Sequence, residues 1–161
     1  METAPATDET PEILVFPPLL AAATPVVAAL LGWLLPLRLL PPLGLGGVAL
    51  LGLLLVLAGG ALAFWGKQTF EKAATNVNPH RPALRLVEGG PYRFTRNPMY
   101  LGIVVAELGL ALALSLDWLV LLTPVIWALL HWGVVLREEA YLTRRFGQPY
   151  IDFLARTRRW I

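Results

Sequence analysis

Two groups of polar residues have types and spacings suited to binding a small charged molecule. The first is the segment 90–100 (GPYRFTRNPMY), in which Arg93 and Arg96 lie three residues apart. Pro98 suits the first turn of a following helix, and the free N–H groups and dipole of a helix N-terminus favour an anion. This segment is therefore a candidate anion site. The alternative is that both arginines only anchor the chain to anionic lipid headgroups.

The second group is Arg137-Glu138-Glu139. Adjacent side chains on a helix point about 100° apart, so the two carboxylates can bind different partners. Arginines suit a carboxylate, whereas glutamates suit an ammonium group and a ribose diol, so the two groups together are compatible with S-adenosylmethionine. The alternative is a solvated helix in which Glu138 pairs locally, for example with Tyr141 or Arg145.

The elements that must position these groups are strongly apolar. Of the 161 residues, 57% are hydrophobic and only 15% are charged, and the mean hydropathy is +0.62. The charges gather in patches between leucine-rich runs, which is typical of an integral membrane protein. A net charge of +2 is too small to indicate nucleic-acid binding, and the lack of cysteine excludes disulfides and cysteine-ligated metals. No metal site is predicted.

Four apolar stretches are long enough to cross a bilayer, which takes about 20 residues each. We therefore expect an all-α integral membrane protein with four transmembrane helices. The acidic residues 1–12 are expected to be a disordered tail, and residues 13–161 are expected to form one domain. The predicted spans cover about 13–37, 43–65, 98–116 and 118–136.

The distribution of Lys and Arg predicts the orientation. Apart from Arg38, all of them lie in the loop 67–97 or in the C-terminal segment 137–161. Positive charge favours the cytoplasmic side of a membrane. The loop, the C-terminal segment and both termini are therefore expected in the cytoplasm. Gly147 and Pro149 predict two short helices in the C-terminal segment, which would form a cofactor pocket together with the loop.

Small residues predict how two of the spans pack. Gly59, Ala63 and Gly66 fall on one face of the second span, which allows a neighbouring backbone to approach closely. Asp117 alone separates the third span from the fourth, so these two spans are expected to form a tight antiparallel hairpin.

Two ionisable residues lie inside the predicted spans, and such residues are often functional. Glu107 is expected either to serve function or to accept a hydrogen bond from the Trp127 indole. His131 lies near the cytoplasmic end of the fourth span. It is expected either to line the site or to pack against Gly102 with a backbone hydrogen bond.

The segments 90–100, Glu138-Glu139 and 146–150 (FGQPY) resemble the isoprenylcysteine carboxyl methyltransferase and phospholipid methyltransferase family. The similarity covers about residues 59–161. The order, the spacing and the membrane placement of the motifs all agree with that family. The resemblance implies an integral membrane enzyme that uses S-adenosylmethionine.

The resemblance also implies site residues. The family's Arg-His/Asn-Pro-x-Tyr cofactor motif falls on residues 96–100, with Asn97 where His is frequent. Its paired glutamates fall on Glu138 and Glu139, and its Gly-rich cofactor segment has only a loose counterpart at Gly59-Gly60. The predicted cofactor-binding residues are Tyr92, Arg93, Arg96, Asn97, Pro98, Tyr100, Glu138, Glu139 and Gly60, and the candidate catalytic residues are Arg96, Glu138 and His131.

The expected function is methyl transfer from S-adenosylmethionine to a membrane-embedded or otherwise apolar acceptor. The first choice is a prenylcysteine-type carboxylate, because a carboxylate is already ionised at neutral pH and needs no general base. The alternative acceptor is a phospholipid amine of the phosphatidylethanolamine type. Membrane lipids or lipid-like acceptors are the expected partners. Two other classes stay open, an NADPH-dependent sterol-type reductase and a non-enzymatic membrane scaffold, and binding titrations with each cofactor would separate them.

Overall fold

The computed structural model describes residues 10–44, 46–78 and 80–161 of the chain. Over these residues the chain is helical, and its only bridge joins Thr95 to Arg158. The predicted all-α class is confirmed, whereas most of the tail predicted for residues 1–12 lies outside the described residues. The elements are α1 (Pro17–Leu34), α2 (Gly47–Lys72), the 3₁₀ turn η1 (Gly90–Arg93), α3 (Pro98–Ala113), α4 (Asp117–Leu130), the π-helical turn η2 (His131–Val135), α5 (Leu136–Phe146) and α6 (Gln148–Arg156).

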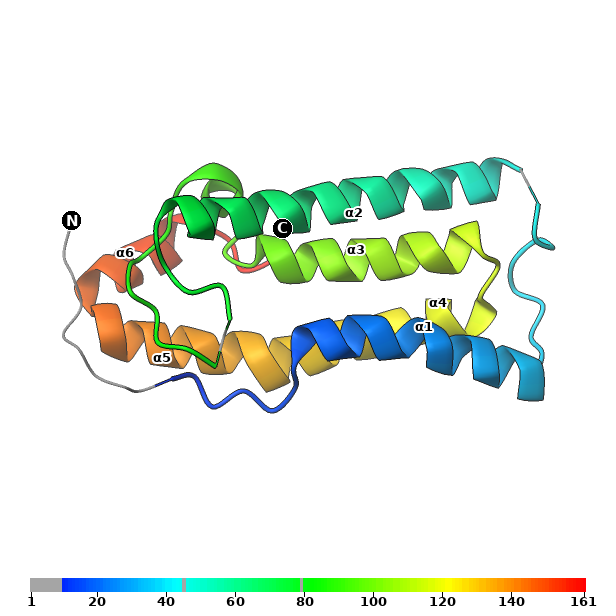
Figure 1. Cartoon of the computed structure of the whole chain (residues 1–161), viewed down its shortest axis with the longest axis horizontal. Coiled ribbons are helices and arrows are strands. Elements are labelled where there is room, and N and C mark those ends of the chain that lie inside the picture. The colour runs from blue at the N-terminus through cyan, green and yellow to red at the C-terminus, as the bar shows by residue number, and fades with distance from the viewer. Residues whose placement is uncertain (1–9, 45, 79) are drawn as a thin grey trace.

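The long helices lie lengthwise beside one another. Helices α2 and α3 are antiparallel neighbours, and α4 runs alongside α1 (Figure 1). The α1–α2 and α3–α4 connections lie at one end of the molecule, whereas the α2–α3 loop, α5 and α6 lie at the other. The Ala83 N–H donates to the Tyr141 hydroxyl (2.9 Å), which joins this loop to α5. The predicted meeting of the loop with the C-terminal segment is therefore confirmed.

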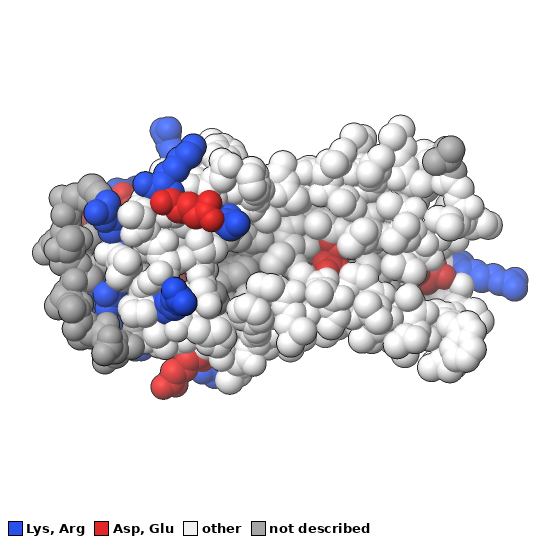
Figure 2. Space-filling view, viewed as in Figure 1, with Lys and Arg blue, Asp and Glu red and all other residues white. Residues whose placement is uncertain are grey.

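Within the described part of the chain, three helices are long and apolar enough to cross a membrane: α1, α2 and the continuous helix Asp117–Phe146, which comprises α4, η2 and α5. Helix α3 is also apolar but has only 16 residues, fewer than the predicted third span. Charged side chains gather at the end of the molecule that holds the loop, α5 and α6, and most of the remaining visible surface is uncharged (Figure 2). This pattern indicates a multi-pass membrane protein.

Helix α3 ends before the predicted end of the third span because a tight turn closes it. The Leu116 N–H donates to the Ala111 carbonyl (2.9 Å) and Ser115 takes a φ of +53°, which is the arrangement of a Schellman motif. The predicted hairpin is present, but its turn takes residues 114–116, and Asp117 begins α4 rather than forming the turn. The Asp117 carboxylate accepts two backbone N–H groups of the α1–α2 connection (2.8 and 3.2 Å), so it ties the two connections together.

The predicted fourth span and the first C-terminal helix form one continuous helix, interrupted only by the π turn His131–Val135. A π turn shifts the hydrogen-bonding register of the backbone and often lies at a functional site. Here the Gly133 carbonyl accepts the N–H of Leu14 (2.9 Å), and Arg137 Nη1 donates to the Glu12 carbonyl (3.0 Å). The segment that precedes α1 is thereby fixed against the middle of this helix.

Small residues bring α2 and α3 into backbone contact. A Cβ added to Gly59 would lie 2.5 Å from the Gly102 carbonyl oxygen and 2.7 Å from the Ala106 nitrogen. A Cβ added to Gly102 would in turn lie 2.8 Å from the Ala63 nitrogen. Gly66 is also buried, against the Met99 side chain. The close approach predicted from the small face of the second span is confirmed.

Gly59→Ala is expected to lower the free energy of unfolding by about 1–3 kcal/mol, because an extra methyl group at a backbone contact forces the helices apart. Gly60→Ala is the matched control, since a Cβ at Gly60 has nothing within 4 Å. Thermal unfolding in detergent, followed by circular dichroism, measures both variants. Equal melting temperatures for the two variants would contradict the close packing described.

Candidate active site

A pocket lies where the α2–α3 loop, the start of α3, α5 and α6 meet, and it encloses about 820 Å³ of empty space, part of it open to solvent. Small-molecule sites are mostly apolar clefts that carry a few well-placed polar groups. Its wall combines aromatic rings with a few charged groups, as such sites require. Lining residues from the polar and aromatic classes are Phe70, Asn76, Asn78, Arg81, Arg85, Tyr92, Arg96, Asn97, Tyr100, Glu138, Glu139, Tyr141, Tyr150 and Phe153.

Arg96, Glu139 and Arg159 form a three-residue ion cluster, hereafter the Glu139 clamp, of which Arg96 and Glu139 line the pocket. Arg96 donates to Glu139 Oε1 from Nε (3.2 Å) and Nη2 (2.9 Å). Arg159 donates from Nη2 to Oε2 (2.8 Å) and from Nε to both carboxylate oxygens (2.9 and 3.1 Å). The Arg96 and Glu139 side chains are only 10% and 12% exposed, so the pair is largely shielded from water.

The clamp fixes the C-terminal end of the chain to the start of α3. Arg96 Nη1 donates to the Leu154 carbonyl (3.1 Å) and to the Thr157 carbonyl. The Arg159 carbonyl accepts hydrogen bonds from Asn97 Nδ2 (3.0 Å) and from the Thr95 hydroxyl. The Arg96 guanidinium thus donates four hydrogen bonds to other groups of the protein. It therefore docks the residues after α6.

The apolar part of the continuous helix ends at Leu136, so Glu138 and Glu139 lie beyond it. Burial alone would raise the pKa of Glu139, but hydrogen bonds from Arg159 and Arg96 outweigh burial and hold this pKa below its ordinary value. Glu139 is therefore a permanent anion that two arginines neutralise. The clamp leaves it little capacity for a further cationic partner.

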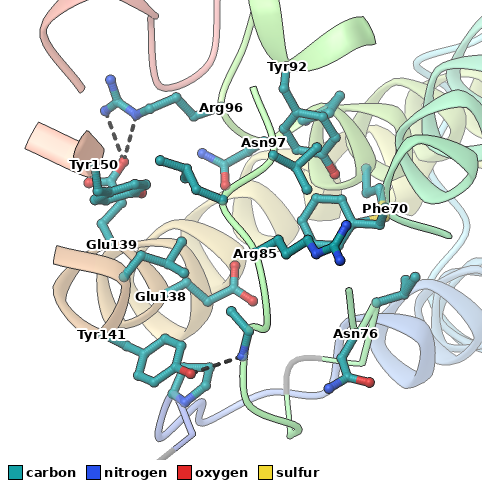
Figure 3. A pocket seen from close by; sticks show the side chains of 18 of the residues that line it. Phe70, Asn76, Arg85, Tyr92, Arg96, Asn97, Glu138, Glu139, Tyr141 and Tyr150 are labelled. Atoms are coloured by element: carbon teal, nitrogen blue, oxygen red, sulfur yellow. Dashed lines mark hydrogen bonds and ion pairs between the residues drawn. The ribbon is translucent and has the colours of Figure 1, made fainter. Parts of the chain in front are cut away.

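Glu138 takes a different partner and has a different pKa. Its Oε1 accepts the Tyr100 hydroxyl (2.8 Å), not the Tyr141 or Arg145 groups that the local-pairing alternative named. Burial raises the pKa of Glu138 to about 7, the hydrogen bond from Tyr100 opposes this rise, and the charge of Glu139 adds to it. In Figure 3 the Glu138 carboxylate points toward the interior of the pocket, whereas Arg96 and Glu139 face each other at its edge.

Tyr92 has a buried hydroxyl in the pocket wall. Among the described residues, no group hydrogen-bonds to this oxygen, and the Tyr92 side chain is buried beside Phe70, with ring centroids 5.1 Å apart. Burial, together with the nearby Glu138 charge, raises the pKa of Tyr92 far above its ordinary value, so the hydroxyl stays protonated. Because an unpaired buried hydroxyl is costly, this oxygen is a candidate ligand-binding group.

The pocket gathers most of the residues that the sequence predicted and leaves three aside. Arg93 is exposed and Gly60 faces open space on α2, and neither lines the pocket. His131 also lies off the pocket wall. The predicted residues that do line it are Tyr92, Arg96, Asn97, Pro98, Tyr100, Glu138 and Glu139.

His131 and Glu107 take surroundings that differ from the expected ones. His131 stacks on Trp127 (centroids 5.2 Å), and its Nδ1 accepts the Trp160 indole N–H (3.1 Å), a side-chain partner in place of the expected backbone one. Glu107 is 2% exposed, and its Oε2 has no hydrogen-bond partner among the described residues. The Trp127 indole is not bonded to it, because that ring lies against His131 instead.

Sequence reasoning missed Arg159 and Arg85. Arg159 lies 20 residues after Glu139, and its contact depends on the turn at Gly147, where φ is +61° and α5 ends as predicted. Arg85 counted only as one of several loop cations, although it lines the pocket. The sequence signal for both residues is that arginines outnumber carboxylates in the loop and the C-terminal segment. This excess shows that some arginines bind partners other than these carboxylates, but it does not identify which arginines they are.

Comparison with known proteins now supplies the family. A family model described as phospholipid methyltransferase matches residues 48–149, which is more than half of the chain. The match includes all lining residues except Pro11, Tyr150 and Phe153. Among curated proteins, no match to the chain is found. Methyltransferases of this family use S-adenosylmethionine, which favours methyl transfer over the reductase and scaffold alternatives. The chain belongs to the phospholipid methyltransferase family, and it is an S-adenosylmethionine-dependent methyltransferase of the membrane.

Proposed function

We propose that the chain binds S-adenosylmethionine in the pocket and transfers its methyl group to the carboxylate of an apolar, prenylcysteine-type acceptor that arrives from the bilayer. The observation that carries this proposal is the wall formed by Tyr100, Glu138 and the Glu139 clamp. It places one uncompensated carboxylate inside a pocket beside the apolar helices. Such a carboxylate suits a cationic ligand.

The membrane arrangement that we propose has four spans, with the pocket and both termini in the cytoplasm. Helix α3 would be the third of these spans along the chain: its 16 residues extend about 24 Å, somewhat less than a bilayer core of about 30 Å, and the packed backbone of α2 lies along it. The cations of the loop and of the C-terminal segment gather at the pocket end, which supports a cytoplasmic location. The cofactor would then enter from the water and the acceptor from the lipid.

The pocket residues fit the chemical groups of this cofactor. Glu138 would hold the ammonium group, because its second carboxylate oxygen has no partner among the described residues. The unpaired Tyr92 hydroxyl would donate to a cofactor oxygen. Tyr100 would position Glu138 through its hydrogen bond. When bound, S-adenosylmethionine supplies a methyl group on a positively charged sulfur, which a nucleophile displaces in line.

The remaining pocket residues would orient the reactants and exclude water. Phe70, Tyr150 and Phe153 supply an apolar wall beside the charged groups. Excluding water strengthens each charge interaction within the pocket and protects the cofactor from hydrolysis. The Glu139 clamp would act indirectly, by holding the residues after α6 against the pocket. Arg93 and Gly60 have no part in this proposal, because they lie outside the pocket.

The titratable groups of the pocket favour a carboxylate acceptor. Among its described residues, Glu139 is neutralised by two arginines, and Tyr92 and Tyr150 are kept protonated by pKa values that burial raises. His131 lies off the wall. If Glu138 pairs with the cofactor ammonium, no general base is left, and an acceptor that is already ionised fits best.

A phospholipid amine is the second candidate. It is favoured by the description of the matching family model and by the pKa of about 7 for Glu138, which is suitable for a general base. In that case Glu138 would accept the proton of the ammonium headgroup rather than bind the cofactor.

The acceptor class can be tested with methyl-labelled S-adenosylmethionine and purified protein in lipid vesicles. One set of vesicles holds a prenylated cysteine with a free carboxylate, and the other holds phosphatidylethanolamine. We expect label only in the prenylcysteine, in a product that releases volatile methanol on mild alkaline treatment, as a methyl ester does. Alkali-stable label in phosphatidylethanolamine alone would establish the amine instead.

Tyr100→Phe is expected to weaken binding of S-adenosylhomocysteine about 3- to 10-fold, because Glu138 loses one hydrogen bond. That bond also lowers the Glu138 pKa, so its removal should move the pH midpoint of binding upward. Calorimetric titration across pH measures both effects. Tyr141→Phe is the matched control: its hydroxyl accepts the Ala83 N–H and touches no carboxylate, so the pH midpoint should stay in place. Identical midpoints for the parent and Tyr100→Phe would refute this role of Tyr100.

A further inference from the structure

Arg85 is a cation of the pocket wall. Its side chain lines the pocket, yet no hydrogen bond or ion pair involves its guanidinium among the described residues. Its backbone N–H alone is bonded, to the Thr75 hydroxyl (3.3 Å). Arg81 also lines the pocket but is exposed to solvent, whereas Arg156 and Arg96 are bound to Glu88 and Glu139. A free guanidinium in a pocket is available for an anionic ligand.

The loop that carries Arg85 is held in place. The Thr75 hydroxyl also accepts the Leu84 N–H (3.0 Å), and Asn76 Nδ2 donates to the Pro82 carbonyl (2.8 Å). The Ala83 N–H bonds to Tyr141 on α5, as described above. Arg85 therefore extends into the pocket from a tethered backbone (Figure 3), which lowers the entropy cost of binding a ligand.

Arg85 shares the pocket with an incompletely bonded carboxylate. Glu138 has one oxygen on Tyr100, and the two side chains form no ion pair, so their charged atoms lie more than 4.0 Å apart. Two opposite charges that line one pocket without neutralising each other suit a ligand that carries both charges. An α-amino acid group has its ammonium and its carboxylate on one carbon.

We propose that Arg85 binds the carboxylate of the amino-acid end of S-adenosylmethionine, opposite Glu138 on the ammonium. This inference rests on the proposed cofactor pocket. It assigns to Arg85 the role that sequence reasoning gave to Arg93 and Arg96. Arg93 lies outside the pocket and Arg96 is committed to the protein. An acceptor carboxylate would pair only with Arg85, whereas the amino-acid end of the cofactor would pair with both Arg85 and Glu138.

The test is a cycle of two ligands and two proteins, measured by calorimetry with detergent-solubilised full-length chain. The ligands are S-adenosylhomocysteine and its decarboxylated analogue, which keeps the ammonium and lacks only the carboxylate. Arg85→Met should bind S-adenosylhomocysteine about 10- to 100-fold more weakly than the parent. The same variant should bind the decarboxylated analogue with unchanged affinity. Arg144→Met, which removes an exposed charge from the same end, should bind both ligands like the parent.

Several outcomes would overturn the assignment, and all but one of them are binding measurements that do not depend on catalysis. Equal loss of affinity for both ligands in Arg85→Met would show a general effect on the pocket. A carboxylate-specific loss in Arg93→Met instead would return the role to that residue. If Arg85→Met does not fold, the parent can still refute the assignment, because equal affinity for the two ligands would leave no carboxylate contact to assign. If Arg85→Met binds S-adenosylhomocysteine normally but has a raised KM for an anionic acceptor, Arg85 serves the acceptor. Failure of the parent to bind S-adenosylhomocysteine at all would refute the cofactor pocket itself.

Discussion

Arg96→Lys is expected to reduce methyl transfer at least about 100-fold, although the positive charge is kept. A lysine ammonium cannot reproduce the planar fork that reaches Glu139 and two backbone carbonyls at once. Breaking a shielded ion pair costs about 3–5 kcal/mol when a charge is left unpaired, and the lysine recovers only part of it. The residues after α6 should therefore leave the pocket, and the Glu139 clamp should lose its shape.

The methyl-transfer rate at saturating cofactor measures the loss of activity, and limited proteolysis measures the release of the C-terminal residues. Arg158→Lys is the matched control, because its side chain is exposed and only its backbone carbonyl is bonded, to the Arg96 N–H (2.9 Å). The control should keep the parent's rate and resist proteolysis. An Arg96→Lys protein with the parent's rate and a protected C-terminus would show that the clamp is dispensable.

Glu138→Gln is expected to weaken S-adenosylhomocysteine binding about 10- to 100-fold at pH 8, because a neutral amide replaces the carboxylate that pairs with the ammonium. The variant should also lose the pH dependence of binding. Since the pKa of Glu138 is raised to about 7, this group is ionised above that pH and protonated below it. The parent's affinity should therefore be constant above about pH 7 and fall as the pH is lowered further.

Calorimetric titration from about pH 5.5 to about pH 8.5, a range that brackets the Glu138 pKa, checks both statements. Glu71→Gln is the matched control, because Glu71 is an exposed carboxylate that pairs with Lys67 and lies off the pocket wall. It should bind like the parent at every pH. If Glu138→Gln keeps the parent's pH profile, another group controls cofactor binding.

The sequence predicted the helices well because long apolar runs and Gly or Pro signals determine them locally. Gly147 ends α5, and Pro98 begins α3, as expected. The end of α3 was predicted too late because leucines continue through the turn at Ser115, and only the backbone geometry reveals the Schellman motif. The continuous helix through Leu136 was divided in the prediction because polarity changes there, although helical hydrogen bonding does not.

The site was predicted in part for a related reason. Motif residues such as Tyr100 and Glu138 lie in the pocket, yet the sequence does not reveal that they bond to each other across 38 positions. By residue type alone, Arg93, Arg96 and Arg85 cannot be distinguished as candidates for binding an anion. Only the fold separates them: Arg93 is exposed, Arg96 is bonded on several sides, and the guanidinium of Arg85 lines the pocket with no partner among the described residues.

The location of the cofactor is the central claim, and photo-crosslinking tests it most directly. Ultraviolet light can attach methyl-labelled S-adenosylmethionine to nearby aromatic side chains, and peptide mapping then locates the label. We expect label in the peptides that carry Tyr92 and Tyr100 or Tyr150 and Phe153, and excess S-adenosylhomocysteine should abolish it. Competable label confined to α1 or to the α1–α2 connection, at the far end of the helices from the pocket, would contradict the account.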